Sequence, residues 1–160
     1  MDTFTLIHVL ISLAAILSGF VVVGGMLTAK TCPRWTGFFL ATTVATSVTG
    51  FFFPFHGFTP ALGFGVISLV VLALAIVALY IKKSAGSWRR IYTVTAGFAL
   101  YLNFFVLVVQ SFQKIPLLKS LAPTQSEPPF VIAQAITLVV FVTLGILTTK
   151  RFHVAPAVTA

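Results

Sequence analysis

The chain has 160 residues, of which 59% are hydrophobic and only 8% are charged, and its mean hydropathy is +1.11. So few polar residues cannot cover a water-soluble core, which excludes a soluble globular protein and indicates an integral membrane protein. The net charge of +8 favours contact with anionic lipid, and nucleic-acid binding is not expected.

Segments of about 20 apolar residues predict membrane-spanning helices, because a helix satisfies its own backbone hydrogen bonds in hydrocarbon. The first apolar segment is too long for the core of a signal peptide and lacks a preceding positive charge, so we interpret it as a retained helix. The connections are short, so we expect an all-α antiparallel bundle forming a single transmembrane domain over residues 1–153, with a short cytoplasmic tail at 154–160. Five segments qualify, at residues 4–27, 35–53, 62–81, 91–110 and 130–149.

Basic residues follow the first, third and fifth segments, whereas the connection after the second segment, residues 55–61, carries no charge. By the positive-inside rule, this asymmetry predicts an amino terminus outside and a carboxyl terminus in the cytoplasm, in the inner (plasma) membrane. Lys114 and Lys119 are exceptions, because they fall in the fourth-to-fifth connection. The residues that set the asymmetry are Lys30, Arg34, Lys82, Lys83, Arg89, Arg90, Lys150 and Arg151.

The second segment contains the stretch "ATTVATSVTG" at residues 41–50, which is rich in small and hydroxyl-bearing side chains. Small residues let helices approach closely in a membrane, and hydroxyls bond to their own backbone or to a neighbour. This pattern predicts that the second helix is a central packing helix.

Two histidines are expected on the outer side. Pro54 ends or kinks the second helix and Gly57 and Pro60 favour a turn, which places His56 at the outer interface. His8 lies about one turn below the outer end of the first helix. An ionisable residue inside the membrane indicates a functional site by default, and neutral imidazoles are ligands for haem iron, copper or zinc.

Amides extend this candidate site. Asn103 and Gln110 share one face of the fourth segment, and Gln134 lies near the outer end of the fifth. Together with His8 and His56 they could hold a haem or the head of a quinone. The alternative is that the amides join helices and that the histidines have structural or interfacial roles.

Other chemistry lacks a motif. The spans contain no acidic residue, and the chain has no Cys-x-x-Cys, His-Glu-x-x-His, phosphate-binding loop or serine elbow. The single cysteine, Cys32, cannot form an internal disulfide. A stand-alone enzyme is therefore not favoured.

Three stretches support a resemblance: "HVLISLAAILSG" (8–19), "TGFFFPFHG" (49–57) and "WRRIYTVTAGFALYLN" (88–103). Over residues 4–112 the chain resembles small bacterial inner-membrane proteins whose pattern is similar to that of four-helix transmembrane b-type cytochromes. The resemblance implies an electron-transfer role with one haem held by His8 and His56, since a second histidine pair is absent.

Three hypotheses follow. The first is an accessory or assembly subunit of a larger membrane complex or homo-oligomer, with small-residue faces and the stretch "LAPTQSEPPF" (121–130) as contact surfaces. The second is a membrane redox protein with one haem or quinone at an outward-facing site. The third is a small-solute channel or carrier lined by Asn103, Gln110 and Gln134. The first requires only packing surfaces and is preferred.

Overall fold

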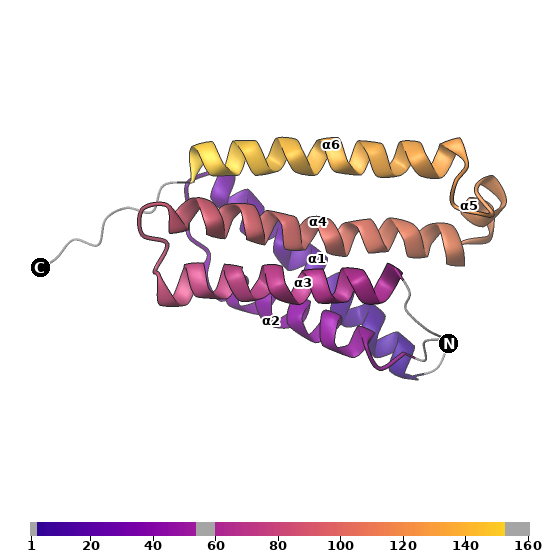
Figure 1. Cartoon of the computed structure of the whole chain (residues 1–160), viewed down its shortest axis with the longest axis horizontal. Helices are drawn as coiled ribbons and strands as arrows, with labels where there is room; N and C mark the ends of the chain where they lie inside the picture. The colour runs from indigo at the N-terminus through magenta and orange to yellow at the C-terminus, as the bar shows by residue number, and fades with distance from the viewer. Residues whose placement is uncertain (1–2, 54–59, 153–160) are drawn as a thin grey trace, which may run out of the picture.

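A computed structural model describes residues 3–53 and 60–152, without the side chains of residues 60–62. All regular elements in these ranges are helices, so the predicted all-α membrane bundle is confirmed (Figure 1). The elements are α1 (Thr3–Leu27), α2 (Pro33–Gly50), α3 (Pro60–Ile76) with a π-helical continuation η1 (Val77–Ile81), α4 (Trp88–Lys114), the short α5 (Pro116–Leu121) and α6 (Pro128–Arg151).

Four described helical segments are long and apolar enough to cross a membrane, which makes the chain a multi-pass membrane protein. They are α1, residues Gly63–Ile81, α4 and α6. The second predicted span, α2, is not among them, because its first turn carries Arg34 and its second half is rich in threonine and serine.

Prolines set several helix boundaries. Helices α2, α5 and α6 each have proline in the first turn, where the missing N–H would have no partner within the helix. Helix α4 extends beyond the predicted 91–110 and ends when Ile115 turns extended before Pro116, as the residue preceding a proline usually does. The short α5 was not predicted from the sequence.

The long helices lie side by side (Figure 1). Helix α4 contacts α1, α3 and α6, whereas α2 packs mainly against α1 and α3. The expectation that the threonine-rich α2 is the central helix is therefore wrong, and α4 holds that position.

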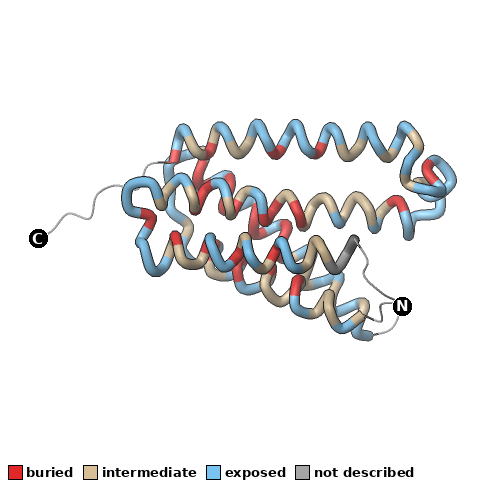
Figure 2. The backbone as a smooth tube through the Cα atoms, viewed as in Figure 1, coloured by how far each residue is buried: buried red, intermediate tan, exposed pale blue. Residues whose placement is uncertain are grey.

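The core lies where α1, α2, α3 and α4 meet, and α6 is largely exposed (Figure 2). Gly19 lies at this junction. A Cβ atom there would come within 2.5 Å of Leu100 and 2.9 Å of Phe39, so the glycine permits the close packing of three helices.

One end of the bundle, which we call the basic end, holds the α1–α2 and η1–α4 connections and the end of α6 (left in Figure 1). The opposite end holds the start of α1 and α5. The basic end carries Lys30, Arg34, Lys82, Lys83, Arg89, Arg90, Lys150 and Arg151, and neither acidic residue of the sequence falls in these segments.

Candidate functional site

His8 lies between α1 and α2, at the end opposite the basic end. Its Nδ1 atom is 2.8 Å from the hydroxyl oxygen of Thr49, and its ring packs edge-on against Phe53 with the ring centroids 5.0 Å apart. The Thr49 hydroxyl donates to the carbonyl of Ala45 at 2.7 Å. When the hydroxyl donates to that carbonyl it can only accept from His8, and in this arrangement the imidazole carries its proton on Nδ1 and Nε2 keeps a lone pair.

The amides of Asn103 and Gln134 also link helices. Asn103 Nδ2 on α4 donates to the hydroxyl of Thr43 on α2 at 3.3 Å. Gln134 Nε2 on α6 donates to the backbone carbonyl of Phe105 on α4, also at 3.3 Å. The Oε1 atom of Gln134 is buried and has no partner among the described residues.

The structure does not gather the other predicted residues around His8. Gln110 is exposed on α4, and its neighbour Gln113 hydrogen-bonds to Gln125 in the connection before α6. His56 lies outside the described residues, so the predicted pairing with His8 remains a prediction.

The described candidates make separate hydrogen bonds, none of them to one another. His8 joins α1 to α2, Asn103 joins α2 to α4, and Gln134 joins α4 to α6. Such bonds contribute about 1 kcal/mol or less each inside a membrane. Within residues 3–53 and 60–152, no group of three or more histidine, cysteine or acidic side chains could hold a metal ion.

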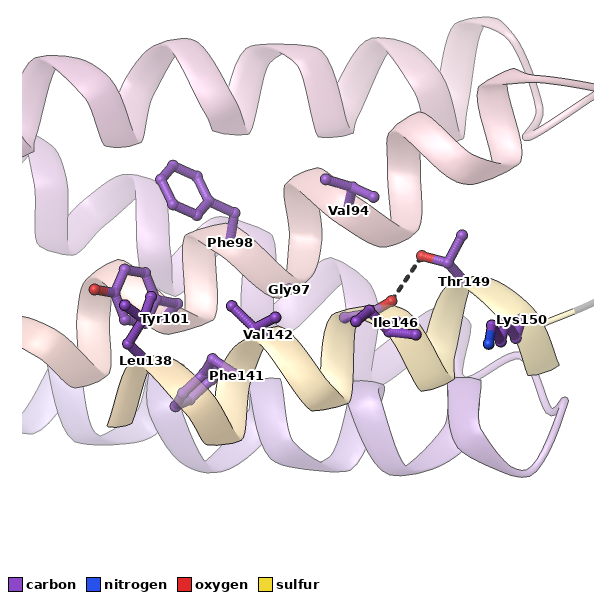
Figure 3. Close-up of a pocket in the computed structure, with 11 residues that line it drawn as sticks. Val94, Gly97, Phe98, Tyr101, Leu138, Phe141, Val142, Ile146, Thr149 and Lys150 are labelled. Atoms are coloured by element: carbon purple, nitrogen blue, oxygen red, sulfur yellow. Dashed lines mark hydrogen bonds between the residues drawn. The ribbon is translucent and has the colours of Figure 1, made fainter. Parts of the chain in front are cut away.

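A groove between α4 and α6 has a volume of about 440 Å³ (Figure 3). Helix α6 contributes only three buried residues along its 24 residues, so one face of each helix stays open. The groove is almost entirely apolar and ends at Thr149 and Lys150 at the basic end. Its wall is formed by Val94, Gly97, Phe98, Tyr101, Leu138, Phe141, Val142, Gly145 and Ile146.

Two glycines in this groove are not needed for packing within the chain. A Cβ atom at Gly97 or Gly145 would meet nothing within 4 Å. By contrast, a Cβ at Gly65 would lie 2.8 Å from the ring of Phe51, and Gly19 is similarly crowded. Glycine in a helix interior costs about 1 kcal/mol relative to alanine in water. Gly97 and Gly145 therefore keep open a surface that no described part of the chain fills.

The groove was missed from the sequence because it joins two helices distant along the chain. Gly97 and Gly145 each stand inside a long apolar segment without a nearby proline, which is the only local signal of their role. Thr149 gives no signal either, because its hydroxyl bonds to the Gly145 carbonyl of its own helix at 2.7 Å (dashed line in Figure 3).

No family model, curated protein sequence or solved structure matches the chain. The function must therefore be argued from the residues and their arrangement.

Proposed function

We propose that this chain is a noncatalytic accessory or assembly subunit of a larger membrane complex, and that it receives a transmembrane helix of its partner in the groove between α4 and α6. The open groove at Gly97 and Gly145 carries this proposal. Small residues on a helix face let a second helix approach closely, and van der Waals packing then drives association in the bilayer.

The contacts that the polar side chains make support the same function. His8, Asn103 and Gln134 are engaged at helix interfaces, as expected of residues that hold a bundle together. A subunit of this kind requires a stable scaffold and a contact face, and both are present without a convergent set of catalytic groups in the described helices.

The proposed placement is the inner membrane, with five crossings and the basic end in the cytoplasm. Helix α2 follows α1 along nearly its full length, since Gly25 lies near Cys32 at one end and the ring of Phe4 packs against that of Phe53 at the other, with ring centroids 5.0 Å apart. Its 18 residues span about 27 Å, close to the thickness of the hydrocarbon core of about 30 Å.

Photo-crosslinking in native membranes tests the proposed partner. A benzophenone amino acid placed at Phe98, in the groove, should form an adduct with another membrane protein, whereas the same probe at Ile67, exposed on α3, should not. Gly97→Leu or Gly145→Leu should abolish the adduct. Gly24→Leu is the matched control, because a Cβ at Gly24 also meets nothing within 4 Å and Gly24 does not line the groove.

Two results would contradict the proposal. Adducts to lipid alone would make the groove a lipid-facing surface. Adducts only between copies of this chain would make the protein a homo-oligomer, and the larger complex would have to be abandoned.

A redox cofactor is a second candidate, favoured by the geometry of His8. Its Nδ1–H bond to Thr49 orients the ring and leaves Nε2 as a lone-pair donor, which is how ligating histidines are commonly held. A haem or quinone bound on this side would place an electron carrier against Phe53. His56 would have to supply the second axial ligand of a haem.

An absorption spectrum before and after dithionite tests this candidate. Purified protein from haem-replete cells should show Soret and α bands that His8→Ala removes and that Thr49→Val shifts. His153→Ala, at a histidine that the proposed site does not include, is the control. A spectrum without these bands would reject the haem, and a quinone would then be sought by extraction.

A further inference from the structure

A second cavity, of about 290 Å³, lies at the basic end. It shares no residue with the groove between α4 and α6. Ligand binding in this cavity is therefore independent of the proposed function. Its inner wall is apolar and includes Val22, Met26 and Phe152, each no more than 4% exposed. The α1–α2 connection, the start of α2, η1 and α4 complete the wall.

Hydroxyl groups line the floor of this cavity. Tyr92, 2% exposed, and Thr36, 5% exposed, both line it, and their hydroxyls lie close enough to interact. A bond between the two hydroxyls uses one of their two hydrogens, so the pair retains a second hydrogen to donate to a ligand. The cavity thus offers a buried donor below its opening.

The rim adds further donors and positive charge. Lys30 and Thr31 are exposed there, and Tyr80, on the π-helical turn η1, is 56% exposed. All three line the cavity. π-Helical turns such as η1 are frequent at functional sites. The surrounding basic end holds eight lysine and arginine residues, and neither acidic side chain of the sequence belongs to it. The positive charge around the cavity therefore favours an anionic ligand over a cation.

The position of the cavity near the membrane surface indicates which kind of anionic ligand would fit it. Lys30 lies three residues beyond the end of α1 at Leu27, which is the level at which lipid headgroups meet a spanning helix. Apolar walls at Val22, Met26 and Leu79 would exclude a fully hydrated ion and suit a headgroup attached to hydrocarbon. Lysine near a membrane surface attracts anionic lipid.

We propose that this cavity binds the phosphate group of an anionic phospholipid. The Lys30 ammonium pairs with the phosphate at the rim, the hydroxyl pair of Tyr92 and Thr36 donates from the floor, and the glycerol and first acyl carbons contact the apolar wall. A bound lipid of this kind would tie the α1–α2 connection to η1 and α4.

Cys32 provides a built-in reporter, because it is the only cysteine of the sequence and lines the cavity. The rate of its alkylation by N-ethylmaleimide is measured by intact mass in nanodiscs of phosphatidylcholine, with and without phosphatidylglycerol. We expect phosphatidylglycerol to slow alkylation. Lys30→Gln should weaken the affinity about tenfold, the loss expected for one charge-assisted hydrogen bond, and Tyr92→Phe should weaken it less.

Three controls make the result decisive. Lys119→Gln removes a lysine at the opposite end and should leave the protection intact. A Ser87→Cys, Cys32→Ser protein reports the general effect of an anionic surface at the basic end, and its alkylation should change little. Inorganic phosphate added to phosphatidylcholine discs tests a soluble source.

Equal protection of Cys32 in the wild type and in Lys30→Gln would overturn the proposal, as would equal slowing at Cys32 and at the cysteine placed at 87. Protection by inorganic phosphate without protection by phosphatidylglycerol would show an anion site that does not take lipid, and would also reject the proposal.

Discussion

Single polar residues in this protein are mostly satisfied close to where they stand in the sequence. The hydroxyls of Ser18, Thr95 and Thr143, for example, each donate to a backbone carbonyl four residues earlier in their own helix. Such bonds remove the cost of an unpaired hydroxyl in hydrocarbon but add no contact between helices. The bonds that cross between helices, such as those of His8, Asn103 and Gln134, therefore matter most for helix position.

The bond between Asn103 and Thr43 is expected to stabilise the bundle modestly. In a double-mutant cycle of Asn103→Leu and Thr43→Val, followed by unfolding in mixed micelles, the coupling free energy should be about 0.6 kcal/mol, typical of such bonds in membranes. Gln110→Leu, at an exposed position of the same helix, serves as control and should leave stability unchanged. A zero coupling would show that the amide has a role other than joining α4 to α2.

Gly19 is expected to tolerate no side chain. Gly19→Ala would place a Cβ 2.5 Å from Leu100 and 2.9 Å from Phe39, and overpacking of this kind costs about 1–3 kcal/mol. Gly24→Ala, on the same helix with nothing within 4 Å, is the matched control. Thermal unfolding in detergent should show a lower Tm for Gly19→Ala only, and equal values would contradict the packing at this junction.

At the scale of elements, α2 and the connection before α6 depart most from simple apolar spans. Helix α2 is shorter than α1 and more polar than α1 and α3, but it lies against α1 from end to end. The connection between α5 and α6 is ordered by Glu127, whose carboxylate accepts hydrogen bonds from the Thr124 hydroxyl at 2.9 Å and from the N–H groups of Thr124 and Ser126, each at 3.1 Å.

We predict that α2 crosses the membrane. In a Cys32→Ser background, single cysteines at Thr31 and Phe52, both exposed, should react with a membrane-impermeant maleimide from opposite sides. Because α2 lies along nearly the full length of α1, it must cross the membrane if α1 does. Labelling of both positions from the same side would show that α2 enters and leaves by one face.

Glu127 should titrate at low pH. The limited desolvation of its carboxylate raises the pKa, but hydrogen bonds from Thr124 and Ser126 lower it by more, so the net pKa lies below that of an unperturbed glutamate. The stabilisation of this connection is therefore present at neutral pH and is lost as the pH falls through the lowered pKa. Carbon-detected NMR titration should show the lowered value, and Thr124→Val should raise it; an unchanged value in that variant would contradict the bonding.

For the molecule as a whole, contacts and charge are distributed unevenly. Helix α4 is covered by α1, α3 and α6, while α6 keeps a broad exposed face and shares the open groove with α4 (Figure 2). Eight of the ten lysine and arginine residues lie at one end. The uneven contacts leave a face of α4 and α6 uncovered, and the uneven distribution of positive charge favours one orientation in the membrane.

The orientation makes a direct prediction. Ser120 and Ser87 are both exposed and lie at opposite ends of the bundle. A cysteine placed at Ser120 should react with a membrane-impermeant maleimide in intact cells, whereas a cysteine placed at Ser87 should react only after permeabilisation. The Cys32→Ser protein is the background control. The reverse pattern would place the basic end outside and remove the basis for the proposed topology.

The apolar pattern of the sequence was enough to identify a helical membrane protein and to locate its long helices, because hydrocarbon admits only segments that satisfy their own backbone and are apolar for about 20 residues. The predicted second and fifth segments begin at residues 35 and 130, two residues after the observed helix starts at Pro33 and Pro128, because proline is favoured in the first turn of a helix.

Which polar residues meet depends on the tertiary structure. The sequence grouped His8, Asn103, Gln110 and Gln134 by expected depth. His8 and Asn103 bond to different threonines of α2, Gln134 bonds to α4, and Gln110 is exposed, because their partners depend on helix rotation and neighbour order. The same holds for the groove at Gly97 and Gly145 and for the cavity at Lys30 and Tyr92. Each is built from segments distant in sequence, and periodicity within one helix contains no information about which helix lies opposite.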